Sequence, residues 1–201
     1  MSRILRVAVL PAAPVLLPAY AGSVDPVPEL RAACRAAVRW LVEDPALPVL
    51  VLSAAPPPID SAACPSRGAR LASLLLGEGG HTGAWSEAGV RGPVRLPAGK
   101  DLAVLAFADG SARRGEKAPG YVDERAVGYD RAVGAALRTG DLAALRGLDL
   151  ELGAELLAEG APVLKALAGC VEQVENAEVG FDDDPFGVQY WVAQWRCVSA
   201  D

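Results

Sequence analysis

Short apolar runs recur along the chain, and each is bounded by proline, glycine or charged residues. Three of them, Ile4–Leu10, Pro48–Ser53 and Asp101–Phe107, are rich in valine and leucine. Uninterrupted runs of this length are typical of strands that are buried on both faces, as in parallel sheets. We therefore predict three inner strands.

Helical periodicity lies between and after these runs. From Pro28 to Glu43, apolar residues recur at spacings of three and four while arginines occupy the other side, which predicts an amphipathic helix. Between residues 60 and 100 the only predicted element is a short helix at Ala69–Leu76. Further helices are expected at Asp123–Arg138, Asp141–Arg146, Leu150–Ala158 and Pro162–Ala168, with Asp141 and Asp149 as N-caps and Gly140 and Gly160 as stops.

The C-terminal region returns to strand. Ala177–Phe181 and Gly187–Val198 are predicted as strands joined by an Asp-Asp-Asp-Pro turn at 182–185. Strands that alternate with helices predict an α/β fold, a mixed and mostly parallel sheet flanked by helices, with an antiparallel strand pair at the C-terminus. We expect a single domain over residues 1–201, with functional groups at the carboxyl ends of its strands.

Charge and hydrophobicity argue against two classes of partner, nucleic acids and membranes. Nineteen basic and 25 acidic residues give a net charge of −6, and the only basic cluster is Arg113, Arg114 and Lys117, so nucleic acid is not an expected partner. No apolar run approaches the roughly 20 residues that span a bilayer, so no membrane association is expected. A small-molecule ligand is the expected partner.

The N-terminal segment is similar to a signal peptide, because Arg3 and Arg6 precede an apolar run that ends in Ala-Tyr-Ala. Three prolines would break this run as a helix, and its removal would delete the first predicted strand. The four cysteines form no Cys-x-x-Cys pair, which indicates neither a zinc site nor a redox motif. We expect a reduced protein in the cytoplasm.

The densest polar stretch, Asp109–Tyr121, directly follows the third predicted strand. Its arginines, lysine and serine could hold a carboxylate or phosphate by charge-assisted hydrogen bonds. A solvated loop whose charges face water explains the same composition equally well. The candidate ligand-binding residues are Asp109, Ser111, Arg113, Arg114, Lys117 and Tyr121, and the candidates for a catalytic role are Asp109, Ser111 and His81.

Two other features are open to a chemical role. Asp182, Asp183 and Asp184 could supply oxygen ligands to magnesium or calcium. Aspartates before a proline are also ordinary turn chemistry, and adjacent side chains cannot all point one way, so the turn is favoured. His81, the only histidine, lies in a glycine-rich segment; a general base and a metal ligand are both open roles, and an exposed loop histidine is favoured.

Three stretches, in this order and spacing, together resemble a small bacterial branch of the class III extradiol ring-cleavage dioxygenase superfamily. They are Val-Ala-Val-Leu-Pro-Ala-Ala-Pro-Val-Leu-Leu-Pro at 7–18, the loop Asp109–Tyr121, and Phe-Asp-Asp-Asp-Pro-Phe-Gly-Val-Gln-Tyr at 181–190. The likeness extends over nearly the whole chain. It implies the fold, and a small-molecule site at the strand ends that uses the polar residues of the loop.

The resemblance also implies ferrous iron, Fe(II), held by two histidines and a glutamate, with three adjacent positions open to a catecholate and dioxygen. Here Ala12 stands where the first histidine is expected, and the second strand end, Ser-Ala-Ala-Pro at 53–56, has no histidine. Because two of three ligands are missing, iron is not expected to bind, and no other cofactor is expected.

The sequence thus predicts an extradiol dioxygenase-like protein without the usual iron site, which binds a small anionic or phenolic molecule. If it is an enzyme, it is an oxidoreductase of the extradiol type or a metal-independent derivative. One alternative is an iron oxygenase with Asp109, Asp182 and His81 as ligands. Another is a structural or interaction protein, in a homo-oligomer or with a related subunit, which an exposed surface around Trp191 and Trp195 would favour.

Overall fold

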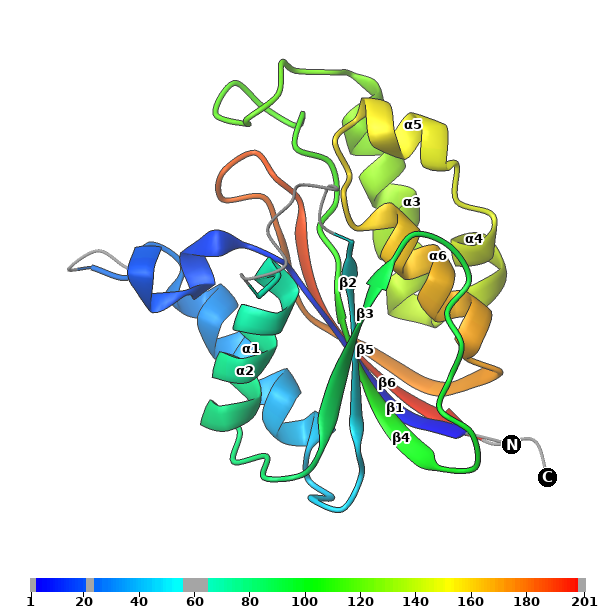
Figure 1. Ribbon diagram of the computed structural model, residues 1–201. Coiled ribbons are helices and arrows are strands. Elements are labelled where there is room, and N and C mark those ends of the chain that lie inside the picture. The colour runs from blue at the N-terminus through cyan, green and yellow to red at the C-terminus, as the bar shows by residue number, and fades with distance from the viewer. Residues whose placement is uncertain (1–2, 21–23, 56–64, 199–201) are drawn as a thin grey trace.

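A computed structural model of the chain describes residues 3–20, 24–55 and 65–198 (Figure 1). Its centre is a six-stranded sheet in the order β3-β2-β4-β1-β6-β5, in which β1 to β4 are parallel and the last two strands are antiparallel to their neighbours. The strands are β1 (Arg3–Leu10), β2 (Val49–Ala54), β3 (Trp85–Val90), β4 (Asp101–Phe107), β5 (Gln173–Asp183) and β6 (Tyr190–Val198). The predicted mixed, mostly parallel sheet is confirmed.

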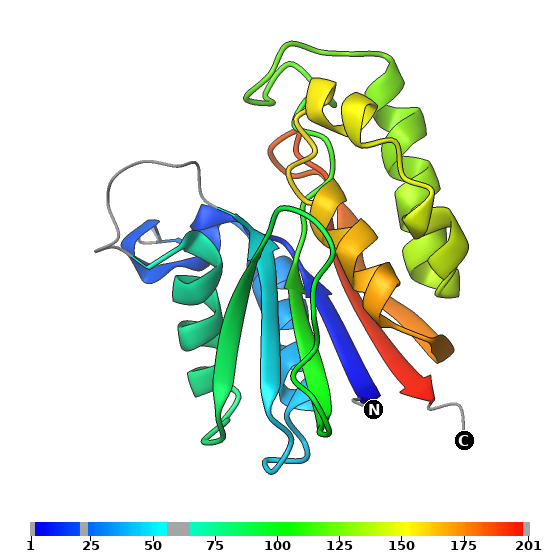
Figure 2. The same cartoon turned by 45° about the vertical axis from the view of Figure 1, so that its right-hand side comes forward.

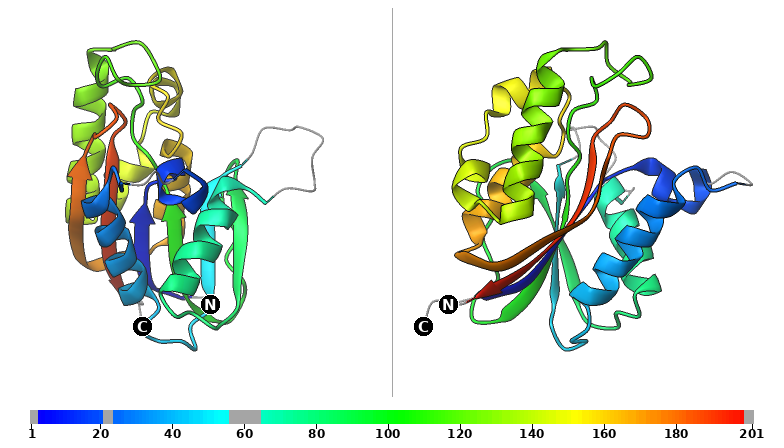
Figure 3. Two further views of the ribbon diagram at one scale, coloured as in Figure 1. Left: turned by 90° about the vertical axis from the view of Figure 1, so that its left-hand side faces the viewer. Right: turned by 180° about the vertical axis from the view of Figure 1, so that it is seen from behind.

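Helices cover both faces of this sheet, as Figures 1 and 2 show from two directions. One layer holds α1 (Pro28–Leu41) and α2 (Arg67–Glu78), and the other holds α3 (Arg125–Thr139), α4 (Leu142–Arg146), α5 (Leu150–Glu155) and α6 (Ala161–Cys170). Two short 3-10 helices, Pro14–Leu16 and Pro18–Tyr20, follow β1. The views in Figure 3 show β5 and β6 together at the edge of the sheet away from β3.

The alternation of side chains along β4 explains why its sequence is apolar throughout. Leu102, Val104 and Ala106 pack against the α3, α4 and α6 layer. Leu105 and Phe107 point to the opposite face and pack against the α1 and α2 layer. Both sets are almost fully buried, as is usual for an inner strand of a parallel sheet.

The helix ends follow the expected capping chemistry. The Asp141 carboxylate accepts a hydrogen bond from the Ala144 amide at 2.9 Å, and Asp149 accepts two such bonds at the start of α5. Gly140 ends α3 in the left-handed conformation, with φ of 66°. Gly160, expected as the stop of the helix before it, lies directly before α6 instead.

Strand β3 was not predicted from the sequence. Its sequence, Trp-Ser-Glu-Ala-Gly-Val, carries no apolar run, because β3 is the edge strand and most of its side chains are at least partly exposed. The predicted turn at 182–185 is also misplaced. Strand β5 continues through Asp182 and Asp183, which pair with Trp191 and Tyr190 of β6.

Trp191 and Trp195 are core residues. They are 1% and 0% exposed, and the indole Nε1 of Trp195 donates a hydrogen bond to the Leu137 carbonyl at 2.9 Å. The exposed tryptophan surface that would favour an interaction protein is therefore absent at these two residues. In the described part of the chain, no helix is both long and apolar enough to cross a membrane.

Candidate functional site

Asp109 lies at the carboxyl edge of the parallel strands, two residues after the end of β4. Strands β1 and β4 are neighbours with Leu10 paired to Phe107, and the Ala108 amide continues the ladder by donating to the Leu10 carbonyl at 2.8 Å. This register brings the two strand ends together, so the Ala12 amide donates a 2.7 Å hydrogen bond to Asp109 Oδ1. The aspartate is thus fixed beside the position where the resemblance would place the first iron ligand.

Three elements surround this carboxylate. Arg67, the first residue of α2, donates a long hydrogen bond of 3.4 Å to the Ala12 carbonyl and lies 3.4 Å from Glu159. Tyr190, the first residue of β6, is buried close enough for the charge of Asp109 to act on its hydroxyl. Within the described ranges, no arginine or lysine forms an ion pair with Asp109, so its charge has no direct partner there.

Asp109 is half-buried, and loss of solvent is the largest influence on the pKa of its carboxyl. Loss of solvent raises the pKa of its carboxyl to about 7, while the Ala12 amide and the charge of Arg67 act in the opposite direction and Glu159 raises it further. Burial, together with the nearby Asp109 charge, also raises the pKa of Tyr190 to about 12. A carboxyl with a pKa near neutrality can either donate or accept a proton at working pH.

Gly160 packs against the backbone of Asp109. Its amide donates to the Asp109 carbonyl at 3.2 Å, and a Cβ added to Gly160 would lie 2.4 Å from both the amide nitrogen and the carbonyl oxygen of Asp109. A side chain could be accommodated only by moving the end of β4. The start of α6 therefore fixes the place of the aspartate.

The structure gives Arg114 a different setting from that of Asp109. Its guanidinium binds Asp184 at 2.5 Å and Asp130 at 3.2 Å. Asp130 is 1% exposed and also accepts the Ser111 amide at 2.8 Å. Burial raises the pKa of Asp130, and the Ser111 amide and Arg114 oppose that shift. Arg114 thus neutralises a buried carboxylate, and its charge is already paired within the protein.

The remaining loop residues do not converge on one point. Ser111 is fully buried; its hydroxyl donates to the Leu156 carbonyl at 2.8 Å and accepts the Arg113 amide at 3.1 Å, so it holds the loop on the helical layer. The Nε of Arg113 is buried and makes no hydrogen bond with the described residues. Lys117 is exposed, and Tyr121 is 91% exposed and projects into solvent.

The three consecutive aspartates are divided among different partners. Asp182 accepts from Arg138 at 2.6 Å and from the Gln189 amide group at 2.9 Å, while Asp184 binds Arg114. Asp183 accepts the amide of its own neighbour, Asp184, at 2.8 Å. The described residues contain no group of three or more His, Cys, Asp or Glu side chains arranged to hold a metal ion.

His81 is not the exposed loop histidine expected from its glycine-rich surroundings. Both ring nitrogens are buried and make no hydrogen bond with the described residues, and the imidazole lies against Gly83. It lies between α2 and β3, at the amino end of β3, whereas Asp109 follows the carboxyl end of β4. The length of the parallel strands separates the two residues, so His81 and Asp109 are not brought together as one ligand set.

A polar cluster that the sequence analysis did not identify lies at the carboxyl end of β2. The hydroxyls of Ser53 and Ser66 both donate to the same carboxylate oxygen of Glu87. Ser66 also caps α2 by accepting the Ala69 amide. Since the strand that carries Glu87 was not predicted, no pattern in the sequence linked these residues. Pro56, the last residue of the Ser-Ala-Ala-Pro strand end, and Cys64, one of the four cysteines, lie outside the described residues.

Arg67, Glu159 and Tyr190 are likewise site residues that the sequence analysis missed. They come from three distant segments, and only the packing of α2, α6 and β6 on the end of β4 brings them near Asp109. No protein-family model matches the chain, and a search of curated proteins finds no significant relative.

Proposed function

We propose that this chain is an extradiol dioxygenase-like protein that binds a small phenolic or anionic molecule beside Asp109, without the iron that this superfamily uses. The observation that carries the proposal is the state of Asp109. It is a half-buried carboxyl that follows the carboxyl end of an inner parallel strand, burial raises its pKa, and its only hydrogen-bond partner among the described residues is a backbone amide. Ligands of open α/β sheets bind at this edge.

The neighbouring groups suit a ligand with a hydroxyl and a negative charge. Above a pH of about 7 the Asp109 carboxylate accepts a hydrogen bond from a phenol, and below it the protonated acid donates to a ligand oxygen. Arg67 makes only 3.4 Å contacts with its protein partners and is 44% exposed, so its guanidinium retains donors for a ligand carboxylate.

The described residues do not fit a ferrous site. Ala12 provides a backbone amide, not an imidazole, and that amide is already bonded to Asp109. His81 lies near the amino ends of the parallel strands, away from Asp109, and Asp182 is already bonded to Arg138 and Gln189.

The ligand can be tested by isothermal titration calorimetry with 4-hydroxybenzoate, which carries both a phenol and a carboxylate. We expect saturable binding, weakened about tenfold by Asp109→Asn because a charged hydrogen-bond acceptor is lost. Asp101→Asn, at the amino end of the same strand, is the matched control and should leave the affinity unchanged. Absence of binding, or equal affinity in D109N, would overturn the proposal.

The two halves of the ligand can be tested separately. Arg67→Gln should weaken binding of benzoate but not of phenol, while D109N should do the reverse. Anaerobic incubation with ferrous iron, desalting and measurement of metal per chain by plasma mass spectrometry tests the absence of an iron site. Near-stoichiometric iron would refute the metal-free account even if 4-hydroxybenzoate binds.

A further inference from the structure

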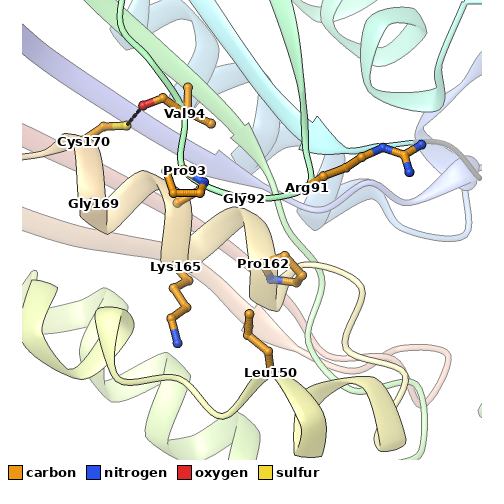
Figure 4. A pocket seen from close by; sticks show the side chains of 10 residues that line it. Arg91, Gly92, Pro93, Val94, Leu150, Pro162, Lys165, Gly169 and Cys170 are labelled. Atoms are coloured by element: carbon orange, nitrogen blue, oxygen red, sulfur yellow. Dashed lines mark hydrogen bonds between the residues drawn. The ribbon is translucent and has the colours of Figure 1, made fainter.

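A cavity of about 320 Å³ lies along α6, in the helical layer formed by α3, α4, α5 and α6 (Figure 4). Its walls come from three segments, namely the chain that follows β3, the start of α5, and one side of α6. It is lined by Arg91, Gly92, Pro93, Val94, Leu150, Pro162, Lys165, Ala166, Gly169 and Cys170. None of these residues belongs to the surroundings of Asp109.

The walls of this cavity are almost entirely apolar. Pro93 and Val94 form one side, and Leu150 and Pro162 lie across from them (Figure 4). The Cys170 thiol donates to the Val94 carbonyl at 3.6 Å, which ties α6 to the segment after β3 and uses the one sulfur in the lining. A volume of this size lies in the range of small-molecule pockets, which are mainly apolar with a few polar groups.

Lys165 lines the cavity, and its side chain extends from α6 on the side away from Pro93 and Val94 (Figure 4). Its Nζ donates to the Leu148 carbonyl at 3.0 Å, and an ammonium group has two further donors. The side chain of Arg91 points away from the other lining residues (Figure 4). The ten lining residues include no aspartate or glutamate, so a ligand anion would meet no opposing carboxylate in the lining.

We propose that this cavity binds a small monocarboxylate with an apolar body, such as an aryl carboxylate. The apolar part would lie against Pro93, Val94 and Leu150, and the carboxylate would accept a hydrogen bond from the Lys165 ammonium. The site is independent of Asp109, so either site can fail without the other.

The location of this binding site can be tested by calorimetric titration of the full chain with 1-naphthoate. Gly169 lies in α6, and a Cβ placed on it meets no atom within 4 Å apart from its own helix, so Gly169→Leu extends into the open cavity. We expect saturable binding that Gly169→Leu weakens about tenfold or more by filling the pocket. Gly128→Leu, at an equally open position on α3, is the matched control and should leave the affinity unchanged.

The charge preference needs a second variant, which also keeps the test valid if Gly169→Leu fails to fold. Lys165→Met retains most of the aliphatic stem, and we expect it to weaken 1-naphthoate about five- to tenfold while the affinity for neutral 1-naphthamide stays within about twofold. Failure of the wild type to bind 1-naphthoate, or equal affinity in folded Gly169→Leu, would overturn the site. Equal affinity for 1-naphthoate in Lys165→Met would overturn the carboxylate preference.

Discussion

Asp109 follows β4, Asp130 of α3 binds the same segment at Ser111, and the two carboxylates differ in how their charge is balanced. Each carboxylate accepts one backbone amide, from Ala12 at 2.7 Å and from Ser111 at 2.8 Å, and burial raises the pKa of both. Asp130 is also paired with Arg114, whereas Asp109 has no ion pair within the described ranges.

The difference separates a structural carboxylate from a candidate functional one. A buried charge that is neutralised by a fixed arginine contributes to the fold and has little capacity left for a ligand. A desolvated carboxyl without such a partner costs stability, and proteins retain such groups mainly at functional sites. Asp130 is therefore a structural residue, and Asp109 is the residue that we propose for ligand binding.

Removal of the balancing arginine should have the largest effect. Arg114→Ala leaves Asp130 buried without its counter-charge, and we expect the free energy of unfolding to fall by about 3–5 kcal/mol. Arg138→Ala removes an exposed ion pair to Asp182 and should cost no more than about 1 kcal/mol. Urea denaturation of both variants measures the contrast, and similar costs for the two would show that Asp130 does not need Arg114.

The second prediction concerns the close contact between Gly160 and the backbone of Asp109. Gly160→Ala places a Cβ against the Asp109 backbone, and we expect it to cost about 1–3 kcal/mol because strand and helix must separate. Gly169→Ala, at an open position of the same helix, should be neutral or stabilise by up to about 1 kcal/mol. If thermal unfolding gives the same result for both alanines, the close approach of Gly160 to Asp109 is not a constraint.

The third prediction concerns the pH dependence of stability. The folded pKa of Asp109, about 7, lies above an unfolded value near 4, so the folded state binds more protons between these limits. The contribution of this group therefore favours folding at low pH and is lost as the pH rises through 7. Asp109→Asn should remove this slope and stabilise the protein at pH 8 by about 1–3 kcal/mol. Parallel pH profiles for wild type and D109N, from urea denaturation, would contradict the assignment.

The smallest effect is expected at the far end of the loop. Tyr121 is 91% exposed, so Tyr121→Ala should change the free energy of unfolding by no more than about 0.5 kcal/mol. It should also leave the affinity for 4-hydroxybenzoate unchanged, since the Tyr121 side chain lies almost entirely in solvent. A tenfold loss of affinity in this variant, measured by calorimetry, would place the ligand over the loop and not at the strand end.

The elements with strong local patterns were predictable from the sequence. Strand β4 was predicted with its observed bounds, and the caps at Asp141 and Asp149 follow from residue type and position alone. Strand β3 was not predictable, because an edge strand needs no apolar run and its Glu87 binds Ser53 of β2 and Ser66, the N-cap of α2. The local sequence pattern predicts the inner strands of the sheet, whereas the edge strand β3 depends on pairing with a strand that is distant in the sequence.

The candidate site was predictable only in part. Asp109 was identified because it follows a buried strand, and that logic depends on sequence order alone. The charge of Arg114 is paired with Asp130 and Asp184, which are 16 and 70 residues away in the chain. The sequence alone could not show that these ion pairs form. Residue type suggests which side chains can bind an anion, and only the fold determines which are already occupied.

The most direct measurement is the titration of the aspartate carboxyls by carbon-detected NMR, with and without 4-hydroxybenzoate. Asp101, on the same strand and paired with Arg3, serves as the internal reference, because the hydrogen bond from Arg3 holds its pKa below the usual value. We predict that Asp109 titrates near 7 and that its titration shifts when the ligand is added. A pKa of Asp109 at or below about 4, unchanged by the ligand, would contradict the account.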